Sequence, residues 1–292
     1  MREERPLLFI DSGAHSLYEK EVHRAGKGSR KRDYSYYDTA EFWAYVDDYA
    51  AFLHENGDVI DHYANVDVIF DPERTWAVQE YLEEEHGLSP VPVVHYGADL
   101  KWIEKYMGRG HSLIGIGGLG QEVRPDAYRV WADRVFDFLC PRPSREPVVR
   151  LHGFAMTSYR LLVRYPWWSV DSASWAKTAA FGGIFVPHRR SGEFTFSVPP
   201  YMIKVSRESP DSELAGRHYD TLSGAAKGVV RDWLEEIGIP LGEGDRDEGG
   251  RSGVVNDHTV RFSANLLFFD KLCEWLPEWP WPFTGTVREG FR

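Results

Sequence analysis

Two aspartates have neighbours that are unusual for an acidic residue. Asp171 lies in YPWWSVDSASW, residues 165–175, together with three tryptophans, a tyrosine and a proline. Asp11 directly follows the apolar run LLFI. A carboxylate in apolar surroundings is costly unless it is paired or used. Two carboxylates that flank one bond can break a glycosidic linkage, so we expect Asp11 and Asp171 to face one pocket and to perform this chemistry.

Both aspartates come at the end of a predicted strand. Short apolar runs alternate with longer amphipathic ones, which is the pattern of strands followed by helices. We predict strands at 6–13, 65–71, 91–97, 113–120, 148–154 and 168–172, and helices at 39–57, 72–87, 98–110, 125–139 and 157–165. This alternation predicts an α/β protein with a parallel sheet, and six units in succession favour a somewhat irregular (β/α)8 TIM-like barrel.

The pattern changes after about residue 180. Residues 182–200 are typical of a β-hairpin with RRSGE as its turn, and helices are predicted at 220–238 and 256–276. A chain of 292 residues accommodates one large barrel or two ordinary domains. We expect a single domain over 1–292, with regular strand–helix units over about 6–180 and a hairpin and helical elaboration over about 181–292.

The net charge, the number of cysteines and the lack of a long apolar run argue against some classes of function. A net charge of −11 argues against a protein that coats nucleic acid through bulk electrostatics, although a local basic patch is compatible with it. Cys140 and Cys273 are the only cysteines, too few for a Cys-rich zinc site. No signal peptide or membrane-length apolar run is visible. We expect a cytoplasmic protein with no metal, no cofactor and no membrane partner.

Other residues that could carry chemistry also fall at predicted strand ends, where the functional residues of a barrel collect. These are Asp71, His95, Gly117 and His152. Each has a structural alternative. Asp71 can be a helix N-cap, and His152 can be a core histidine. The glycine-rich run GIGGLG, residues 115–120, lacks the G-x-G-x-x-G spacing of a dinucleotide fold.

The order of these segments resembles the tRNA-guanine transglycosylase family over roughly residues 6–180. DSGAHSL, which begins at Asp11, is similar to the family's DSGGFQ stretch with its second catalytic aspartate. SVDSASW stands where the family has its nucleophilic aspartate, and VIFDPERT where it has a base-recognising one. Three further segments occupy the places of the family's strand ends that contact the base: VPVVHYG, GIGGLG and VRLHGFAMT.

The chain differs from the tRNA-guanine transglycosylases in several features, and these differences point to one branch of the family. The chain has no C-x-C-x-x-C pattern, is shorter than the bacterial tRNA enzymes and has HYG in place of QGG. These features resemble the DNA-directed branch, the 7-deazaguanine DNA transglycosylases of phages and bacterial DNA-modification clusters. The resemblance implies exchange of guanine in DNA for a free 7-deazaguanine, in a bacterial or phage-infected cytoplasm. The DNA would be single-stranded or a duplex with a flipped guanine.

The resemblance also implies roles for residues. Asp171 is expected to form a covalent deoxyribosyl ester inside an aromatic wall that excludes water, and Asp11 to deprotonate the incoming base. The residues expected to hold the base are Asp71, His95, Tyr96, Gly117, Gly118, Leu119 and His152.

Contact with DNA also needs positive charge. Residues 19–33 follow Asp11 and carry six basic and three acidic side chains. The basic ones are Lys20, Arg24, Lys27, Arg30, Lys31 and Arg32. The predicted hairpin adds His188, Arg189 and Arg190. We expect both sets to contact DNA, the alternative being two solvated surface runs.

Three other functions stay open at this point. The first is base exchange on tRNA, and the second is a nucleic-acid binding module without catalysis. The third is a barrel hydrolase that acts on a nucleoside or a sugar. The sequence does not determine the oligomeric state.

Overall fold

The computed structural model describes residue 5 and residues 7–23, 32–118, 123–156, 158–208, 216–243 and 250–276. The chain divides into two compact units. Unit 1 runs to Met156 and includes Tyr165–Asp171, whereas the described part of unit 2 consists of 158–164 and the residues from Ser172 onward. The expected single domain stays a prediction, because this division does not measure independent folding.

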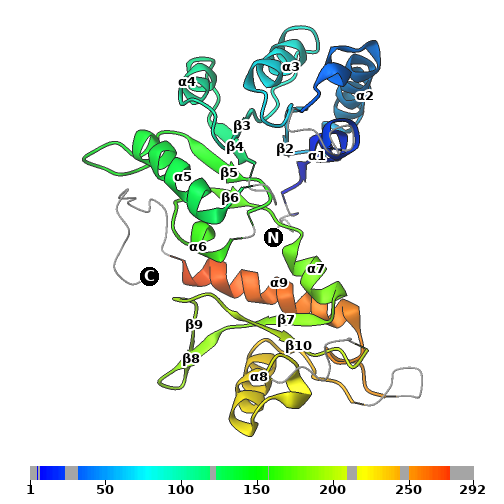
Figure 1. Ribbon diagram of the computed structural model, residues 1–292, viewed down its shortest axis with the longest axis vertical. Coiled ribbons are helices and arrows are strands. Elements are labelled where there is room, and N and C mark those ends of the chain that lie inside the picture. Colours follow the sequence, from blue (N-terminus) through cyan, green and yellow to red (C-terminus); the bar gives the residue numbers. More distant parts are fainter. Residues whose placement is uncertain are drawn as a thin grey trace. The chain divides into compact units, whose positions relative to one another are not determined.

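Six short parallel strands occur in the described part of unit 1, and each pairs with strands that neighbour it in the sequence (Figure 1). The larger sheet contains β3 (Val93–His95), β4 (Leu113–Gly117), β5 (Arg150–Gly153) and β6 (Ser169–Val170). β1 (Phe9–Ile10) pairs with β2 (His62–Tyr63), and a parallel bridge between Ala64 and Val91 connects this pair to the start of β3. Unit 1 therefore has the mixed α/β structure with a parallel sheet that the sequence predicts.

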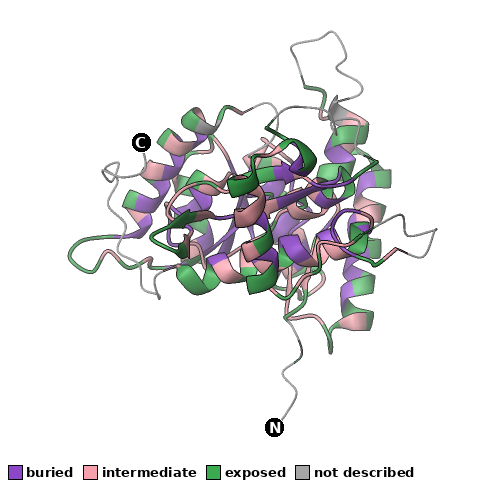
Figure 2. Ribbon diagram, turned by 90° about the horizontal axis from the view of Figure 1, so that it is seen from below, coloured by how far each residue is buried: buried purple, intermediate pink, exposed green. Residues whose placement is uncertain are grey.

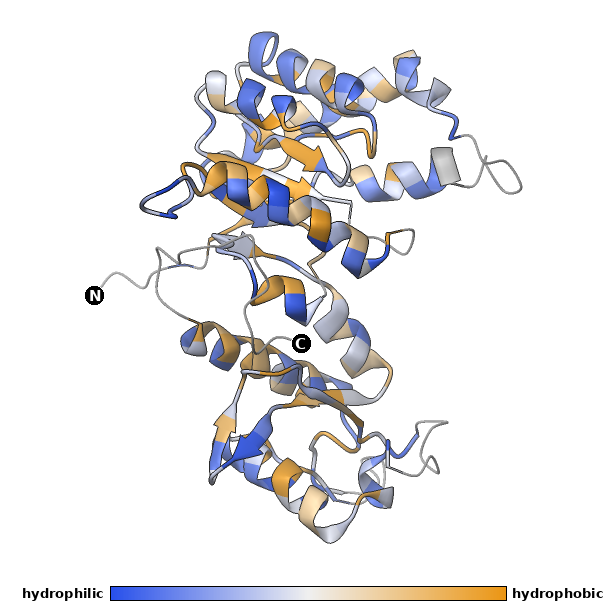
Figure 3. Cartoon of the chain, turned by 60° about the vertical axis from the view of Figure 1, so that its left-hand side comes forward, coloured by the Kyte–Doolittle hydropathy of each residue, from blue (hydrophilic) through white to orange (hydrophobic). Residues whose placement is uncertain are grey.

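The helices of unit 1 lie along the outer side of these strands (Figure 1). They are α1 (Ala14–Leu17), α2 (Ala40–Asn56), α3 (Pro72–Glu84), α4 (Lys101–Gly108) and α5 (Pro125–Leu139), with a π-helical turn at Tyr18–His23 and a 3-10 turn at Ser35–Asp38. α2 buries Phe42, Val46 and Leu53 at helical spacing. The strands are hydrophobic and mostly buried, whereas each long helix has a buried and an exposed stripe (Figures 2 and 3).

Side chains from distant strands of unit 1 meet each other. The ring of Phe9 on β1 lies 4.6 Å from that of His152 on β5. The ring of His62 on β2 lies 5.3 Å from Trp168, which directly precedes β6. In a flat sheet, β1 and β5 would be about 19 Å apart, because neighbouring strands are about 4.8 Å apart. The series of strands is therefore strongly curved, and these rings fill its inner side.

The segment after β2 differs from the predicted strand at 65–71. The N–H of Val68 donates to Thr75 Oγ1 at 2.9 Å, and Asn65 Nδ2 donates to the Thr75 carbonyl at 2.9 Å. Beyond the N–H of Asn65, which donates to the Val91 carbonyl at 3.0 Å, these polar groups of the segment thus pair with the start of α3. Val66 and Val68 are still fully buried. The alternation of the sequence is confirmed, but the regular strand is not.

Unit 2 has other elements. They are α6 (Tyr159–Leu162), α7 (Ser174–Ala180), β7 (Gly183–Val186), β8 (His188–Arg190), β9 (Glu193–Thr195), β10 (Tyr201–Lys204), a 3-10 turn at Tyr219–Thr221, α8 (Gly224–Glu236) and α9 (His258–Trp275). β8 and β9 form a hairpin around Ser191 and Gly192, whose φ values of 50° and 92° suit a tight turn. The predicted hairpin is present but shorter, because β7 pairs with β10. The two predicted helices correspond to α8 and α9.

α9 packs against α7 and β7. Asn265 of α9 connects them, since its Oδ1 accepts from Phe185 N at 2.9 Å and its Nδ2 donates to the carbonyls of Trp175 and Gly183. Among the helices in the described ranges, none combines the length and the apolar character needed to cross a membrane.

Candidate active site

Asp11 and Asp171 lie at the same edge of unit 1. Asp11 directly follows β1 and Asp171 directly follows β6. The carboxyl ends of parallel strands lie at one edge of a curved sheet. The two carboxylates also interact: partial loss of solvation raises the pKa of Asp171, and the negative charge of Asp11 raises it further. The structure thus places these two predicted residues at one edge of unit 1, where the charge of Asp11 acts on Asp171.

The loop after β5 holds the Asp171 carboxylate. The N–H of Ala155 donates to Asp171 Oδ1 at 2.6 Å, and the N–H of Met156 donates to the Asp171 carbonyl at 2.8 Å. Ala155 has a φ of 50°, a left-handed conformation that costs about 1 kcal/mol or more for a residue with a Cβ. Because only Oδ1 has a hydrogen-bond partner among the described residues, Oδ2 is available for chemistry.

The expected aromatic wall around Asp171 is wrong. The Asp171 side chain is 57% exposed. Tyr165 stacks on Phe136 of α5 with 4.5 Å between ring centroids, and Trp167 packs edge-on against the same ring. Trp168 packs on the inner side of the strands, as described above. These aromatic residues precede β6, whereas Asp171 follows it, so they support the strand from its other end.

His152 lies beside the aspartate pair. Its Nε2 is 3.8 Å from Asp171 Oδ1, too far for a hydrogen bond, and its Nδ1 is 2.8 Å from Ser169 Oγ. Burial lowers the pKa of His152 to about 4, and the nearby His62 contributes. The imidazole is therefore neutral at pH 7, and the charge of Asp171 is not compensated by it.

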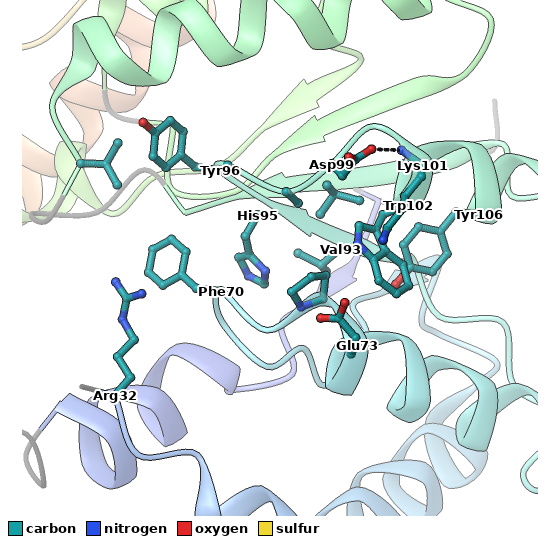
Figure 4. A pocket seen from close by; sticks show the side chains of 15 residues that line it. Arg32, Phe70, Glu73, Val93, His95, Tyr96, Asp99, Lys101, Trp102 and Tyr106 are labelled. Atoms are coloured by element: carbon teal, nitrogen blue, oxygen red, sulfur yellow. Dashed lines mark hydrogen bonds between the residues drawn. The ribbon is translucent and has the colours of Figure 1, made fainter. Parts of the chain in front are cut away.

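A pocket of about 530 Å³ lies at the end of β3 and the loop that follows it (Figure 4). We call it the β3 pocket. The side chains that line it include those of Arg32, Phe70, Glu73, His95, Tyr96 and Asp99. Asp11 and Asp171 are not among the lining residues. The predicted base-binding residues thus separate: His95 and Tyr96 line this pocket, whereas His152 lies beside the aspartates.

His95 is the last residue of β3 and is held by a residue that the sequence analysis missed. His95 Nε2 lies 2.8 Å from Asp67 Oδ2, and the two side chains are only 6% and 11% exposed. In the run Val66-Asp67-Val68 the valines point into the helix-side core, so alternation places Asp67 on the opposite side. That alternation was the signal that could have identified Asp67.

Two glycines leave space for His95 and Tyr96, because a Cβ at either position would crowd these residues. A Cβ at Gly117 would lie 3.2 Å from His95 Cδ2, tighter than ordinary contact. Gly118 has a φ of 85°, and a Cβ there would lie 2.9 Å from Tyr96 N and 3.2 Å from the Phe70 ring. These predicted base-binding glycines therefore have a packing role at the pocket edge.

Asp71 caps α3. Its Oδ1 accepts from Arg74 N at 3.0 Å, and its Oδ2 pairs with Arg74 Nη1 at 2.7 Å. Both oxygens are therefore already bonded, and Asp71 does not line the β3 pocket, although its neighbour Phe70 does. Phe70 has a φ of 65°, a conformation that is rare for an aromatic residue and common at functional sites.

The basic residues expected to contact DNA have different surroundings. Arg24, Lys27, Arg30 and Lys31 lie outside the described residues, as does Leu119 of the base-binding set. Lys20 pairs with its neighbour Glu21 at 2.8 Å. Arg32 lines the β3 pocket, with its guanidinium 4.3 Å from the centroid of the Phe70 ring.

In unit 2, Arg189 pairs with Asp232 of α8 and donates to the Gly192 carbonyl at 2.9 Å. His188 stacks on Tyr201 at 3.9 Å, and Arg190 is exposed. The described contacts thus give Arg189 a partner within its own unit and give His188 an aromatic one.

No group of three His, Cys, Asp or Glu side chains is placed to hold a metal ion within the ranges that the structure describes. Burial raises the pKa of the Cys140 thiol to about 12, so this thiol is not a nucleophile at neutral pH.

The site therefore offers two interacting carboxylates at one strand edge and, on the same unit, a pocket lined by aromatic rings and a buried Asp–His pair. The first arrangement suits attack at an acetal-type carbon, and the second suits a flat polar ligand. Comparisons of the chain with protein-family models, with curated proteins and with solved structures give no match.

Proposed function

We propose that the protein is a base-exchange enzyme that replaces guanine in DNA with a 7-deazaguanine through a covalent aspartyl intermediate. The observation that carries this proposal is the position of Asp11 and Asp171, which directly follow two different parallel strands at one edge of unit 1. The charge of Asp11 also raises the pKa of Asp171. Retaining glycoside chemistry needs two carboxylates close to one sugar carbon. The resemblance to the guanine transglycosylases supplies the substrate class.

We also propose that the strands of unit 1 form the first part of a (β/α)8 barrel. Sequential parallel strands with helices on the outside are the repeating unit of that fold. The contacts of Phe9 with His152 and of His62 with Trp168 support strong inward curvature. An open, gently twisted sheet would keep those rings well apart.

In the proposed reaction, Asp171 Oδ2 attacks C1′ of a flipped deoxyguanosine while the C1′–N9 bond breaks, and the base leaves with the bond's electron pair on N9 and takes a proton from water. The Asp11 carboxylate then takes the proton from the ring nitrogen of the incoming 7-deazaguanine. That nitrogen attacks C1′ and displaces the Asp171 carboxylate, and Asp11 returns its proton to water, which restores both side chains. The N–H of Ala155 holds Oδ1 and so orients the attacking oxygen.

The surroundings of Asp171 support a nucleophilic role. The neighbouring His152 is neutral at pH 7, so it does not neutralise the carboxylate that must stabilise a positively charged transition state. Asp11 and partial desolvation raise the free energy of the ionised Asp171, which favours its conversion to a neutral ester.

The experiment supplies labelled 7-deazaguanine with duplex DNA, single-stranded DNA and tRNA. We expect label in DNA and loss of all exchange and of the covalent adduct in Asp171→Ala. Asp48→Ala, which removes an exposed carboxylate from α2, is the matched control. Label that enters only tRNA would contradict the DNA assignment, and normal exchange by Asp171→Ala would contradict the nucleophile.

The exposure of Asp171 favours a second candidate, a hydrolase that acts on a nucleoside or on DNA. Water that reaches the ester would release the base without replacing it. Release of guanine with no incorporated label would identify this hydrolase. The simultaneous presence of both aspartates at one edge argues against a binding module without catalysis.

A further inference from the structure

We propose that Tyr45 is a positioning residue for Asp11, and that its hydroxyl group holds the loop after β1 in the place from which the Asp11 carboxylate acts. Tyr45 belongs to α2, among the helices outside the strands, and it acts only through Asp11. The proposal rests on the proposed function for the step that this placement serves, the removal of a proton from the incoming base.

The first argument is how the backbone is held on either side of Asp11. On the strand side, the Ile10 carbonyl accepts a hydrogen bond from the N–H of Ala64 at 2.9 Å. On the loop side, the Ser12 carbonyl accepts one from the Tyr45 hydroxyl at 2.6 Å. No backbone N–H in the described ranges donates to the Ser12 carbonyl. The Tyr45 hydroxyl is therefore the group that fixes the backbone directly after Asp11.

The second argument is that the Asp11 side chain has only weak support of its own. Its Oδ1 accepts from Gly13 N at 3.3 Å, which is longer than the usual range for such a bond. Asp171 differs, since its Oδ1 accepts from Ala155 N at 2.6 Å. The direction in which the Asp11 carboxylate points therefore depends on the backbone that Tyr45 holds.

The third argument is the close fit of the Tyr45 hydroxyl against this loop. Gly13 has a φ of 76° and directly precedes α1. A Cβ at this position would lie 2.6 Å from the Tyr45 hydroxyl oxygen. Glycine is thus needed both for the backbone conformation and for the space that the hydroxyl occupies. Ser12 is only 2% exposed, so removal of the hydroxyl would leave its buried carbonyl without this donor.

Tyr49, one turn further along α2, provides a matched comparison. It is also buried, and its hydroxyl donates to the Ala64 carbonyl at 2.9 Å. The backbone at Ala64 has additional support, because Ala64 forms a parallel bridge with Val91 and its own N–H donates to the Ile10 carbonyl. The end of β2 is therefore held without the Tyr49 hydroxyl.

The experiment separates the two halves of the proposed reaction in Tyr45→Phe and in the control Tyr49→Phe. The full chain is first mixed with DNA alone, and the covalent adduct is measured. Labelled 7-deazaguanine is then added, and its incorporation is followed. Asp11 acts only in this second half. We expect Tyr45→Phe to form the adduct at the wild-type rate and to incorporate label about 10- to 100-fold more slowly, because catalysis is this sensitive to a misplaced group.

The control and a second variant test whether the effect belongs to the Asp11 loop. Tyr49→Phe should match the wild type in both halves of the reaction. Gly13→Ala, whose Cβ would displace the Tyr45 hydroxyl, should slow incorporation and leave adduct formation unchanged. Normal incorporation in Tyr45→Phe, slower adduct formation in it, or an equal loss in Tyr49→Phe would overturn the proposal.

A double variant tests whether Tyr45 acts through Asp11. In an Asp11→Ala background, Tyr45→Phe should have no further effect on incorporation, since no carboxylate is left to be placed. A further slowing of about 10-fold in that background would mean that the hydroxyl only supports the fold, and would overturn the proposal.

A measurement that needs neither DNA nor turnover follows the position of Asp11 directly. Partial loss of solvation raises the pKa of Asp171, and the charge of Asp11 raises it further. A ¹³C-carboxyl NMR titration of Asp171 therefore reports on Asp11. We expect the pKa of Asp171 to fall in Tyr45→Phe, in the same direction as in Asp11→Asn, and to stay unchanged in Tyr49→Phe.

The two proposals fail in distinguishable ways. If the wild type exchanges no base while Tyr45→Phe still lowers the pKa of Asp171, the proposed function is rejected and the placement of Asp11 by Tyr45 is kept. If the wild type exchanges base and Tyr45→Phe changes neither the pKa of Asp171 nor the incorporation of label, the positioning role is rejected and the proposed function is kept.

Discussion

Replacement of His152 by glutamine should reduce the loss of folding stability that accompanies acidification. His152 is buried against Phe9 and Phe154, and burial lowers its pKa from 6.5 to about 4. The unfolded chain therefore binds a proton near pH 6.5, whereas the folded protein does not bind it until near pH 4. Because the unfolded state binds more protons in this range, stability falls as the pH falls through it.

The magnitude follows from the difference between the two pKa values. Each pKa unit corresponds to about 1.4 kcal/mol, so the full effect below pH 4 is about 3 kcal/mol. Between about pH 7.5 and pH 5, where the folded ring is still neutral, the corresponding loss is about 2 kcal/mol. His152→Gln has no titrating ring at this position, so this part of the pH dependence should disappear.

The assay is urea unfolding at the two pH values, followed by tryptophan fluorescence and by far-UV circular dichroism. Coincident transitions would justify a single free energy of unfolding for each condition. His54→Gln, on the exposed face of α2, controls for loss of an imidazole. If wild type and His152→Gln lose the same free energy on acidification, the ring is not held neutral by burial and the reasoning about Asp171 loses its basis.

Three further predictions can be checked with the same protein. Asp171→Asn should melt at a higher temperature than wild type at pH 7, because its raised pKa shows that the ionised form is disfavoured in the fold; a lower melting temperature would contradict this. Asn265→Leu should lower the free energy of unfolding in urea by about 3 to 5 kcal/mol, since Phe185 N and two carbonyls lose their buried hydrogen-bond partner. A loss below about 1 kcal/mol would mean that these three hydrogen bonds do not stabilise the fold. Gly115→Ala should cost about 1 to 3 kcal/mol, because the new Cβ would lie 2.2 Å from the Phe154 ring, and a neutral effect would mean that the ring moves freely.

Much of unit 1 was predictable because apolar runs and helix signals are local. The runs that end at Asp11, His95 and Asp171 were identified as strand ends, and their relative positions follow from the parallel pairing of the strands. The predicted strands are longer than the observed ones. Hydrophobic alternation does not reveal whether the backbone groups of a segment pair with the backbone of a neighbouring strand or with a side chain, as the N–H of Val68 does with Thr75 Oγ1.

The site was harder to predict than the strands. Asp67 was overlooked because a polar residue inside an apolar run looks like an interruption until its partner, His95, is known from the fold. The aromatic residues next to Asp171 in sequence were assigned to its pocket, but sequence proximity does not say on which end of a two-residue strand a side chain packs. The dual role open to Asp71 could be decided only from the bonds that Arg74 makes.

The path of the chain through its two units limits how the protein can be divided. The chain contributes 158–164 to unit 2, returns to unit 1 for Tyr165–Asp171 and then leaves it again. A fragment that stops at Met156 would lack β6 and Asp171, and one that starts at Ser172 would lack α6. A break at any one position of the chain therefore interrupts at least one of the two units.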